Sequence, residues 1–214
     1  MPLDKMIVTS LPNGGTHGSY TGGIANKFGV QTIMDFYLQM ALLGKAYQVR
    51  AGTITTPLVG DVVITDTAAE YCVDATSGLT IIPVNSNISI RLGTGTLHEY
   101  AIKSVGVVSS AGTAFVPLPL LMGGDAALTT ARVAAAGGVT VTAEAATTTR
   151  RHWSFSNPVA AGAGHEPKVL DWSPRMPPII KGAGCLYVQI AATTTGPSYY
   201  SSLDYLEIPT STIL

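Results

Sequence analysis

Charged side chains are scarce in this sequence. Asp, Glu, Lys and Arg make up 12% of its 214 residues, whereas about 25% is usual for soluble domains. Twelve basic and thirteen acidic side chains leave a formal net charge of −1. The chain therefore has no strong field with which to hold nucleic acid, acidic lipid or anionic substrates nonspecifically, and a generic basic binding protein is excluded.

Cysteine and long apolar runs are scarce as well. Cys72 and Cys185 are the only cysteines, and a domain of this length does not depend on a disulfide for its stability. Each lies in a strand-like run, so we expect two small buried hydrophobic residues, with a bridge between neighbouring strands as the alternative. The sequence lacks both an apolar run long enough to span a membrane and the apolar segment of a signal peptide, so neither is expected.

The composition predicts a surface made largely of small, weakly polar side chains. A compact monomer of this mass exposes about 9,000 Å², which so few charged groups cannot cover densely, and Thr and Ala must supply much of the rest. Such a surface is cheap to desolvate, and a net charge near zero promotes association. We therefore expect an assembly of copies of the chain; a Gly-, Thr- and Ala-rich secreted or thermophilic β domain is the alternative.

Alternating apolar residues predict a mainly β protein. Ile88, Ile90 and Leu92 alternate with polar residues, which places them on one face of a strand. Further strands are expected at 46–55, 61–65, 97–108, 113–118, 139–142, 152–156, 186–190 and 205–208. Turns rich in Gly and Pro separate them, so the sequence predicts an antiparallel β-sandwich or jelly roll with one or two short helices.

The two helices are expected outside these strands. Apolar residues recur at helical spacing from Val30 to Leu43, although a buried strand over 36–43 fits the same stretch. Asp125 follows two glycines and precedes an Ala-rich run that ends at Gly137. This is the pattern of an N-capped helix of about three turns.

Two segments are predicted to be irregular. Residues 1–29 are Gly-rich and lack an apolar period, so we expect a flexible N-terminal arm followed by a single β-sandwich domain over 30–214. The stretch 157–181 contains five prolines and is expected to form one long loop. A loop of that length in a compact domain is usually functional or packed against a neighbour.

Catalytic and metal-binding motifs are missing from the sequence. Its four histidines are scattered, and neither a Gly-x-Ser-x-Gly motif nor a complete glycine-rich phosphate motif occurs. Asp66-Thr67 resembles the catalytic turn of aspartic proteases, but Ala68 stands where that turn needs glycine. We therefore expect neither an enzyme nor a protein with a cofactor or a bound metal.

Candidate contact residues occur at two places. Arg150 and Arg151 lie beside Trp153, a grouping that suits contact with nucleic acid or with an acidic group of a neighbouring subunit; a solvated strand edge is the alternative. Tyr199 and Tyr200 offer large amphipathic side chains of the kind that interfaces favour, with a corner of the core as the alternative.

The order of these features resembles that of viral jelly-roll coat proteins. The resemblance covers about residues 46–208 and includes the runs Leu186–Ile190, Tyr199-Tyr200 and Leu203–Ile208, which are similar to the closing strands of capsid subunits. It implies an eight-stranded double sheet, a place in the virion, and contacts with copies of the chain and with other virion proteins.

One departure from these coat proteins concerns the genome. Many small RNA-virus coat proteins begin with an Arg- and Lys-rich arm. In this sequence, Lys5 and Lys27 are the only Lys or Arg residues before Phe28. Nucleic-acid contact is therefore expected to be minor or absent, or the chain decorates a shell built by another protein. A different class of function fits the same architecture: a carbohydrate- or receptor-binding domain of a phage tail or adhesin, with Trp153, Trp172 and the C-terminal tyrosines lining a groove.

Overall fold

The structure is a computed structural model that describes residues 24–25, 31–32, 36–92, 96–134, 138–143, 148–156 and 168–212. The chain divides into two units, residues 1–39 and residues 40–214. In the first unit, β1 (Ile24–Ala25) and β2 (Gln31–Thr32) form an antiparallel pair. The rest of the predicted N-terminal arm lies outside the described residues.

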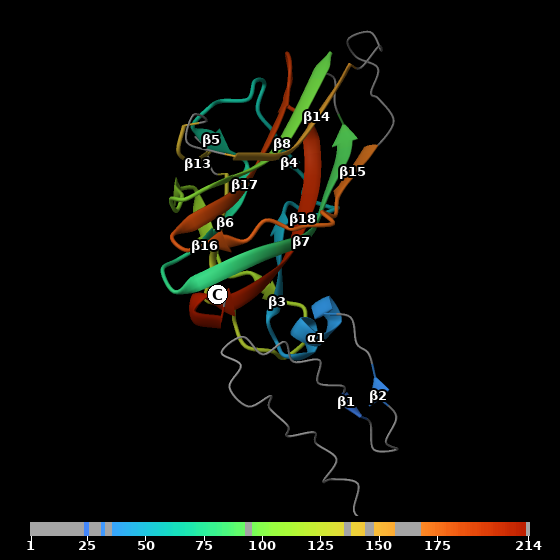
Figure 1. Cartoon of the computed structure of the whole chain (residues 1–214). Helices are drawn as coiled ribbons and strands as arrows, with labels where there is room; N and C mark the ends of the chain where they lie inside the picture. Colours follow the sequence, from blue (N-terminus) through green and yellow to red (C-terminus); the bar gives the residue numbers. More distant parts are fainter. Residues whose placement is uncertain are drawn as a thin grey trace, which may run out of the picture. The chain divides into compact units, whose positions relative to one another are not determined.

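The second unit is an antiparallel β-sandwich, as the alternating pattern predicts (Figure 1). One sheet has six strands, in the order β10 (Thr113–Phe115), β12 (Thr130–Val133), β6 (Tyr71–Ala75), β17 (Gly184–Ala192), β8 (Leu97–Val105) and β14 (Thr148–Ser156). The other follows the order β11 (Leu118–Pro119), β3 (Ala46–Ala51), β18 (Ser198–Pro209), β7 (Leu79–Leu92) and β15 (Lys168–Trp172), with β16 (Ile180–Lys181) on β7 and β4 (Leu58–Val59) on β18.

Eight strands of these two sheets follow a regular order of pairing. Taken along the chain, they are β3, β6, β7, β8, β14, β15, β17 and β18. The first pairs with the last, the second with the seventh, the third with the sixth and the fourth with the fifth. Two further pairings, β18 with β7 and β17 with β8, complete the central part of each sheet.

The core lies between the two sheets because each contributes every second residue to it. Val49 and Leu203 from one sheet belong to the same buried cluster as Ile102 and Leu186 from the other. Hydrogen bonds join the two sheets inside this core as well; in one of them the Tyr71 hydroxyl lies 2.6 Å from Ser201 Oγ. Burial raises the pKa of Tyr71 to about 12, so the hydroxyl keeps its proton and remains a donor.

The six-stranded sheet is covered on its outer face as well. Strands β5 (Ala68–Ala69), β13 (Val139–Thr140) and β9 (Ser110–Ala111) form a small third sheet. Val139 and Val141 pack against Cys72, Cys185 and Tyr187 in a second buried cluster. Every residue of β17 is therefore buried, which explains why this strand reads as a continuous apolar run.

The helix predicted after Asp125 is wrong. Residues 130–133 form β12, which pairs with β6 on one side and β10 on the other. Ala131 is part of the sandwich core, and Arg132 lies 3.5 Å from the buried carboxylate of Asp74. Pairing with strands distant in the sequence thus overrides the local helical preference of the alanines.

Three other segments differ from their predictions. Within the stretch 30–43, where a helix is predicted, the described residues form β2 at 31–32 and the helix α1 (Phe36–Leu42). The predicted strand 61–65 makes only one bridge, at Asp61, and leaves Val62 and Val63 exposed. The predicted loop 157–181 contains β15, because Leu170 and Trp172 alternate into the core, and it also contains β16. A final turn of 3₁₀ helix covers Thr210–Thr212.

A buried glutamate holds the irregular 60–66 segment against the sheet. The Asp61 N–H lies 2.9 Å from Ile190 O and 3.1 Å from Glu70 Oε1. The second oxygen of Glu70 lies 3.5 Å from the Tyr199 hydroxyl. Burial, together with the nearby Asp61 carboxylate, raises the pKa of Glu70 to about 8, so the folded chain keeps a proton at neutral pH that the unfolded chain loses.

The raised pKa of Glu70 predicts a pH-dependent stability. Between pH 4.5 and about 8, the folded state binds more protons than the unfolded state, so the free energy of unfolding falls as the pH rises, by at most about 1.4 kcal/mol per pH unit. Glu70→Gln should remove this component of the slope in urea denaturation curves measured across the window. Glu99→Gln, which changes a partly exposed glutamate, is the control. Equal slopes for the wild type and Glu70→Gln would contradict the assignment.

Candidate functional site

The five predicted contact residues lie in two separate places. Arg150, Arg151 and Trp153 are on β14, at the edge of the six-stranded sheet, whereas Tyr199 and Tyr200 are on β18 in the middle of the other sheet. The structure therefore does not bring them together into one site.

The basic cluster on β14 is exposed, but both of its arginines already contact neighbouring side chains of the same chain. Arg150 Nε donates to Ser104 Oγ over 2.7 Å, and the Arg151 guanidinium lies 5.2 Å from the centre of the Trp153 ring. Trp153 itself packs partly against the core. Arg150 also sits where the pairing with β8 shifts register. A bulge and charged side chains are the features that keep an edge strand from pairing with other strands, so this edge suits side-chain contacts rather than strand addition.

Tyr199 is not available for contact with another subunit. Its side chain is fully buried between the sheets, where burial, and secondarily the Glu70 carboxylate, raise its pKa well above the usual value. The prediction of a surface role is wrong for this residue, and the alternative of a core position is correct. Trp172 is buried in the same core, so it cannot line an exposed groove.

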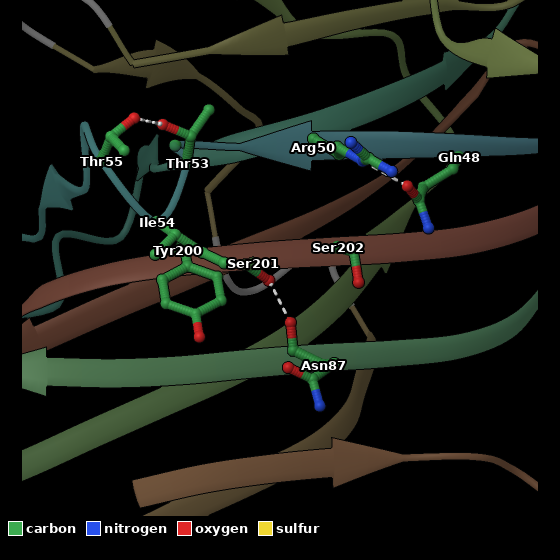
Figure 2. A pocket seen from close by; sticks show the side chains of 10 residues that line it. Gln48, Arg50, Thr53, Ile54, Thr55, Asn87, Tyr200, Ser201 and Ser202 are labelled. Atoms are coloured by element: carbon green, nitrogen blue, oxygen red, sulfur yellow. Dashed lines mark hydrogen bonds between the residues drawn. The ribbon is translucent and has the colours of Figure 1, made fainter. Parts of the chain in front are cut away.

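Tyr200 points the other way, into a pocket on the outer face of the seven-stranded sheet. The pocket has a volume of about 500 Å³, within the range of about 300–1,000 Å³ that small-molecule sites occupy. Figure 2 shows Tyr200 and Ser202 of β18 between Gln48 and Arg50 of β3 and Asn87 of β7. The turn Thr53–Thr55 closes one end. This set offers an aromatic ring, hydroxyls, amides and one guanidinium.

Hydrogen bonds beside the pocket hold its amide groups in fixed orientations. Gln48 Nε2 donates to Asp204 Oδ1 over 2.8 Å, and its oxygen accepts a hydrogen bond from Arg50 Nε. Asn87 Nδ2 donates to Asp171 Oδ1 over 2.7 Å. Both aspartates thus serve as acceptors for the amides and are not among the residues that line the pocket.

The turn at the end of the pocket depends on Gly52. Its φ of +71° lies in the left-handed region, and a Cβ there would come within 3.0 Å of the Leu58 nitrogen. The turn is closed by a hydrogen bond from Thr53 N–H to Thr56 O over 2.9 Å, and the Arg91 guanidinium donates to Ile54 O. The pocket wall is therefore built by a defined turn rather than by free side chains.

A second polar cluster lies on the opposite side of the sandwich, on the outer face of the six-stranded sheet. One donor atom each from Cys72, Asp74 and Cys185 lies within 4.8 Å of the others, and all three residues are buried. The Asp74 oxygens already accept hydrogen bonds from the Ser109 N–H and hydroxyl, at 2.8 and 2.7 Å, and Oδ2 lies 3.5 Å from Arg132 Nε. A cation would compete with Arg132 for this carboxylate, so the cluster suits a structural role better than metal binding.

Among the described residues of the β-sandwich unit, exposed apolar side chains are most concentrated in the segment 116–122, here called the β11 segment. It carries five exposed apolar residues: Val116, Leu118, Leu120, Leu121 and Met122. Met122 is 96% exposed. Leu118 and Pro119 pair with β3 at the edge of the seven-stranded sheet, and the two prolines of the segment remove hydrogen-bond donors from that edge. The β11 segment therefore presents apolar side chains without presenting a strand edge that can be extended.

Comparison of the chain with known protein families, with curated proteins and with solved structures found no match. No helix in the described part of the chain is long and apolar enough to cross a bilayer. The functional interpretation therefore depends on the topology and on the chemistry of these surfaces.

Of the residues that line the pocket, the sequence analysis identified only Tyr200 as a candidate contact residue. The alternation in β3 gives the weak signal that existed: Gln48 and Arg50 lie on the face opposite to Tyr47, Val49 and Ala51. The signal was insufficient because a pocket also requires β3, β18 and β7 to be neighbours, and these strands are far apart in the sequence.

The structure predicts that both cysteines are unreactive in the folded chain. Both are free and buried, and the hydrogen bond with Cys72, together with burial, raises the pKa of Cys185 well above the usual value. Because thiolates and not thiols react, labelling by a disulfide reagent should be slow in native buffer and fast in denaturant. Cys72→Ser should retain one slow thiol. Native labelling as fast as that of the denatured chain would contradict the predicted burial.

Proposed function

We propose that this chain is a structural subunit of a virus shell and assembles with copies of itself and with other virion proteins. The pairing order of the eight strands carries the proposal. A chain whose strands pair first with eighth, second with seventh, third with sixth and fourth with fifth is a long antiparallel hairpin folded over into two sheets. This order supports a jelly roll, the double-sheet architecture that viral capsid domains use.

The distribution of charge supports assembly over a free monomer. Four of the few ionisable side chains, Glu70, Asp74, Lys103 and Glu207, are buried and contribute no charge to the surface. Glu207, for example, accepts hydrogen bonds from the Leu128 and Thr129 N–H groups at 3.0 and 2.8 Å and so fixes a connection between strands. The exterior is therefore even poorer in charge than the composition indicates, and such surfaces associate.

The β11 segment supplies the apolar contact that the proposal needs. When a second copy of the chain covers its exposed Leu and Met side chains, the free energy of the assembly falls by about 25 cal/mol per Å² of apolar area removed from water. The prolines at 117 and 119 make edge-to-edge strand pairing unfavourable, so the contact is one between side chains. The exposed Arg150 and Arg151 are candidates for a second, polar contact.

Assembly can be tested with substitutions in the β11 segment. We expect the purified wild-type chain to form large closed particles that negative-stain imaging and light scattering detect at high micromolar concentration. The double substitution Leu120→Asp, Met122→Asp should leave small species, because it places charges in the contact, and circular dichroism should show that the β-sandwich is intact. Val107→Asp, at an exposed apolar residue outside the segment, is the control and should still assemble.

Two outcomes would overturn the proposal. A wild-type chain that stays monomeric at these concentrations would remove its basis, and particles formed equally well by the double variant would remove the role of the β11 segment. A stable small oligomer of the wild type would favour the other class of function, a binding domain of a phage tail or adhesin.

A further inference from the structure

We infer that the pocket on the outer face of the seven-stranded sheet is a binding site for a saccharide. The inference goes beyond the proposed shell function and does not depend on it. It follows from the juxtaposition of Tyr200 with the amides and hydroxyls of β3, β7 and β18, which belong to distant parts of the sequence (Figure 2).

The aromatic ring provides the apolar part of the site. A pyranose ring has one face of C–H groups and a rim of hydroxyls, so it needs an apolar surface beside polar partners. Tyr200 is half-buried, with its neighbour Tyr199 directed into the core, and its ring lies in the pocket (Figure 2). An amphipathic ring of this kind gives a large contact area at a low cost in conformational entropy.

The polar part of the site has already lost its conformational freedom. Gln48 is held by Asp204 and Arg50, and Asn87 is held by Asp171 and by Ser89 Oγ at 3.1 Å. Groups fixed before binding do not have to be ordered by the ligand, which favours affinity for a ligand that offers only hydrogen bonds. Amide, hydroxyl and guanidinium groups together can donate to and accept from sugar hydroxyls.

The charge of the pocket fits this ligand better than a phosphate or a metal ion. Of the described residues, Arg50 is the only charged one that lines it, and its Nε donates a hydrogen bond to Gln48. Two carboxylates next to the lining amides, Asp171 and Asp204, offset that positive charge and disfavour strongly anionic ligands. Each accepts a hydrogen bond from an amide and neither lines the pocket, so the pocket itself offers a cation no carboxylate. A hydroxyl-rich ligand with little charge remains.

The test is binding of the full chain to an immobilised array of neutral and carboxylate-bearing saccharides, followed by titration with the saccharide that is retained. We expect saturable binding that Tyr200→Ala weakens about tenfold or more, and that Tyr200→Phe, which keeps the ring, weakens less. Thr55→Arg, at an exposed position of the pocket wall, should block the site without affecting the core. Asn85→Ala, on the same face of β7 but outside the pocket, should bind like the wild type.

Three results would overturn the inference. The first is that the wild-type chain binds no saccharide on the array more strongly than the Thr55→Arg variant does. Another is a retained saccharide whose affinity is the same for the wild type, Tyr200→Ala and Thr55→Arg, because the ligand would then bind elsewhere. The third is equal weakening by Asn85→Ala and Tyr200→Ala, which would indicate a general effect on the sheet. Particle formation by each variant, measured as above, separates loss of this site from failure of the shell proposal.

Discussion

The two-residue alternation of β18 is the constraint on which both the core and the pocket depend. This strand pairs with β3 and β4 on one side and β7 on the other, so its central part is hydrogen-bonded along both edges. Tyr199, Leu203 and Tyr205 then face the other sheet and are buried. Tyr200 and Ser202 must face outward, where they line the pocket. A shift of one residue in register would exchange the two sets and destroy both features.

The sequence predicted the fold class because period-two alternation is a local property. It predicted less of the site, because a site depends on which strands lie side by side in the sheet. That order is set by pairing between distant segments and is not visible in any one strand. Tyr199 and Tyr200 illustrate the limit: composition marks both as interface residues, and only the direction of the pleat separates the buried one from the exposed one. The Ala-rich run after Asp125 illustrates another, since its pairing with β6 and β10 involves partners that no local pattern identifies.

The scarcity of ionisable side chains has a structural counterpart in how the buried carboxyl groups are used. Asp74 and Glu207 each accept hydrogen bonds from backbone N–H groups of connecting segments, and Glu70 accepts one from Asp61. Carboxyl groups in this protein thus fix irregular chain to the sheets, a role that disulfides or metals fill in other small β proteins. The two cysteines remain free and buried beside Asp74, which agrees with a chain whose connections are fixed by hydrogen bonds.

The surfaces of the sandwich differ in chemistry, and this difference makes the two proposals compatible. The apolar β11 segment lies at one edge of the seven-stranded sheet, while the pocket lies over its central strands β3, β18 and β7. Contacts at the edge therefore leave the central face free to bind a ligand. A single open pocket gives weak binding, but a shell of identical copies repeats it many times. Because linked sites bind with an affinity that exceeds each site by about 10²–10⁴-fold, assembly would turn a weak saccharide site into firm attachment to a glycan-bearing surface.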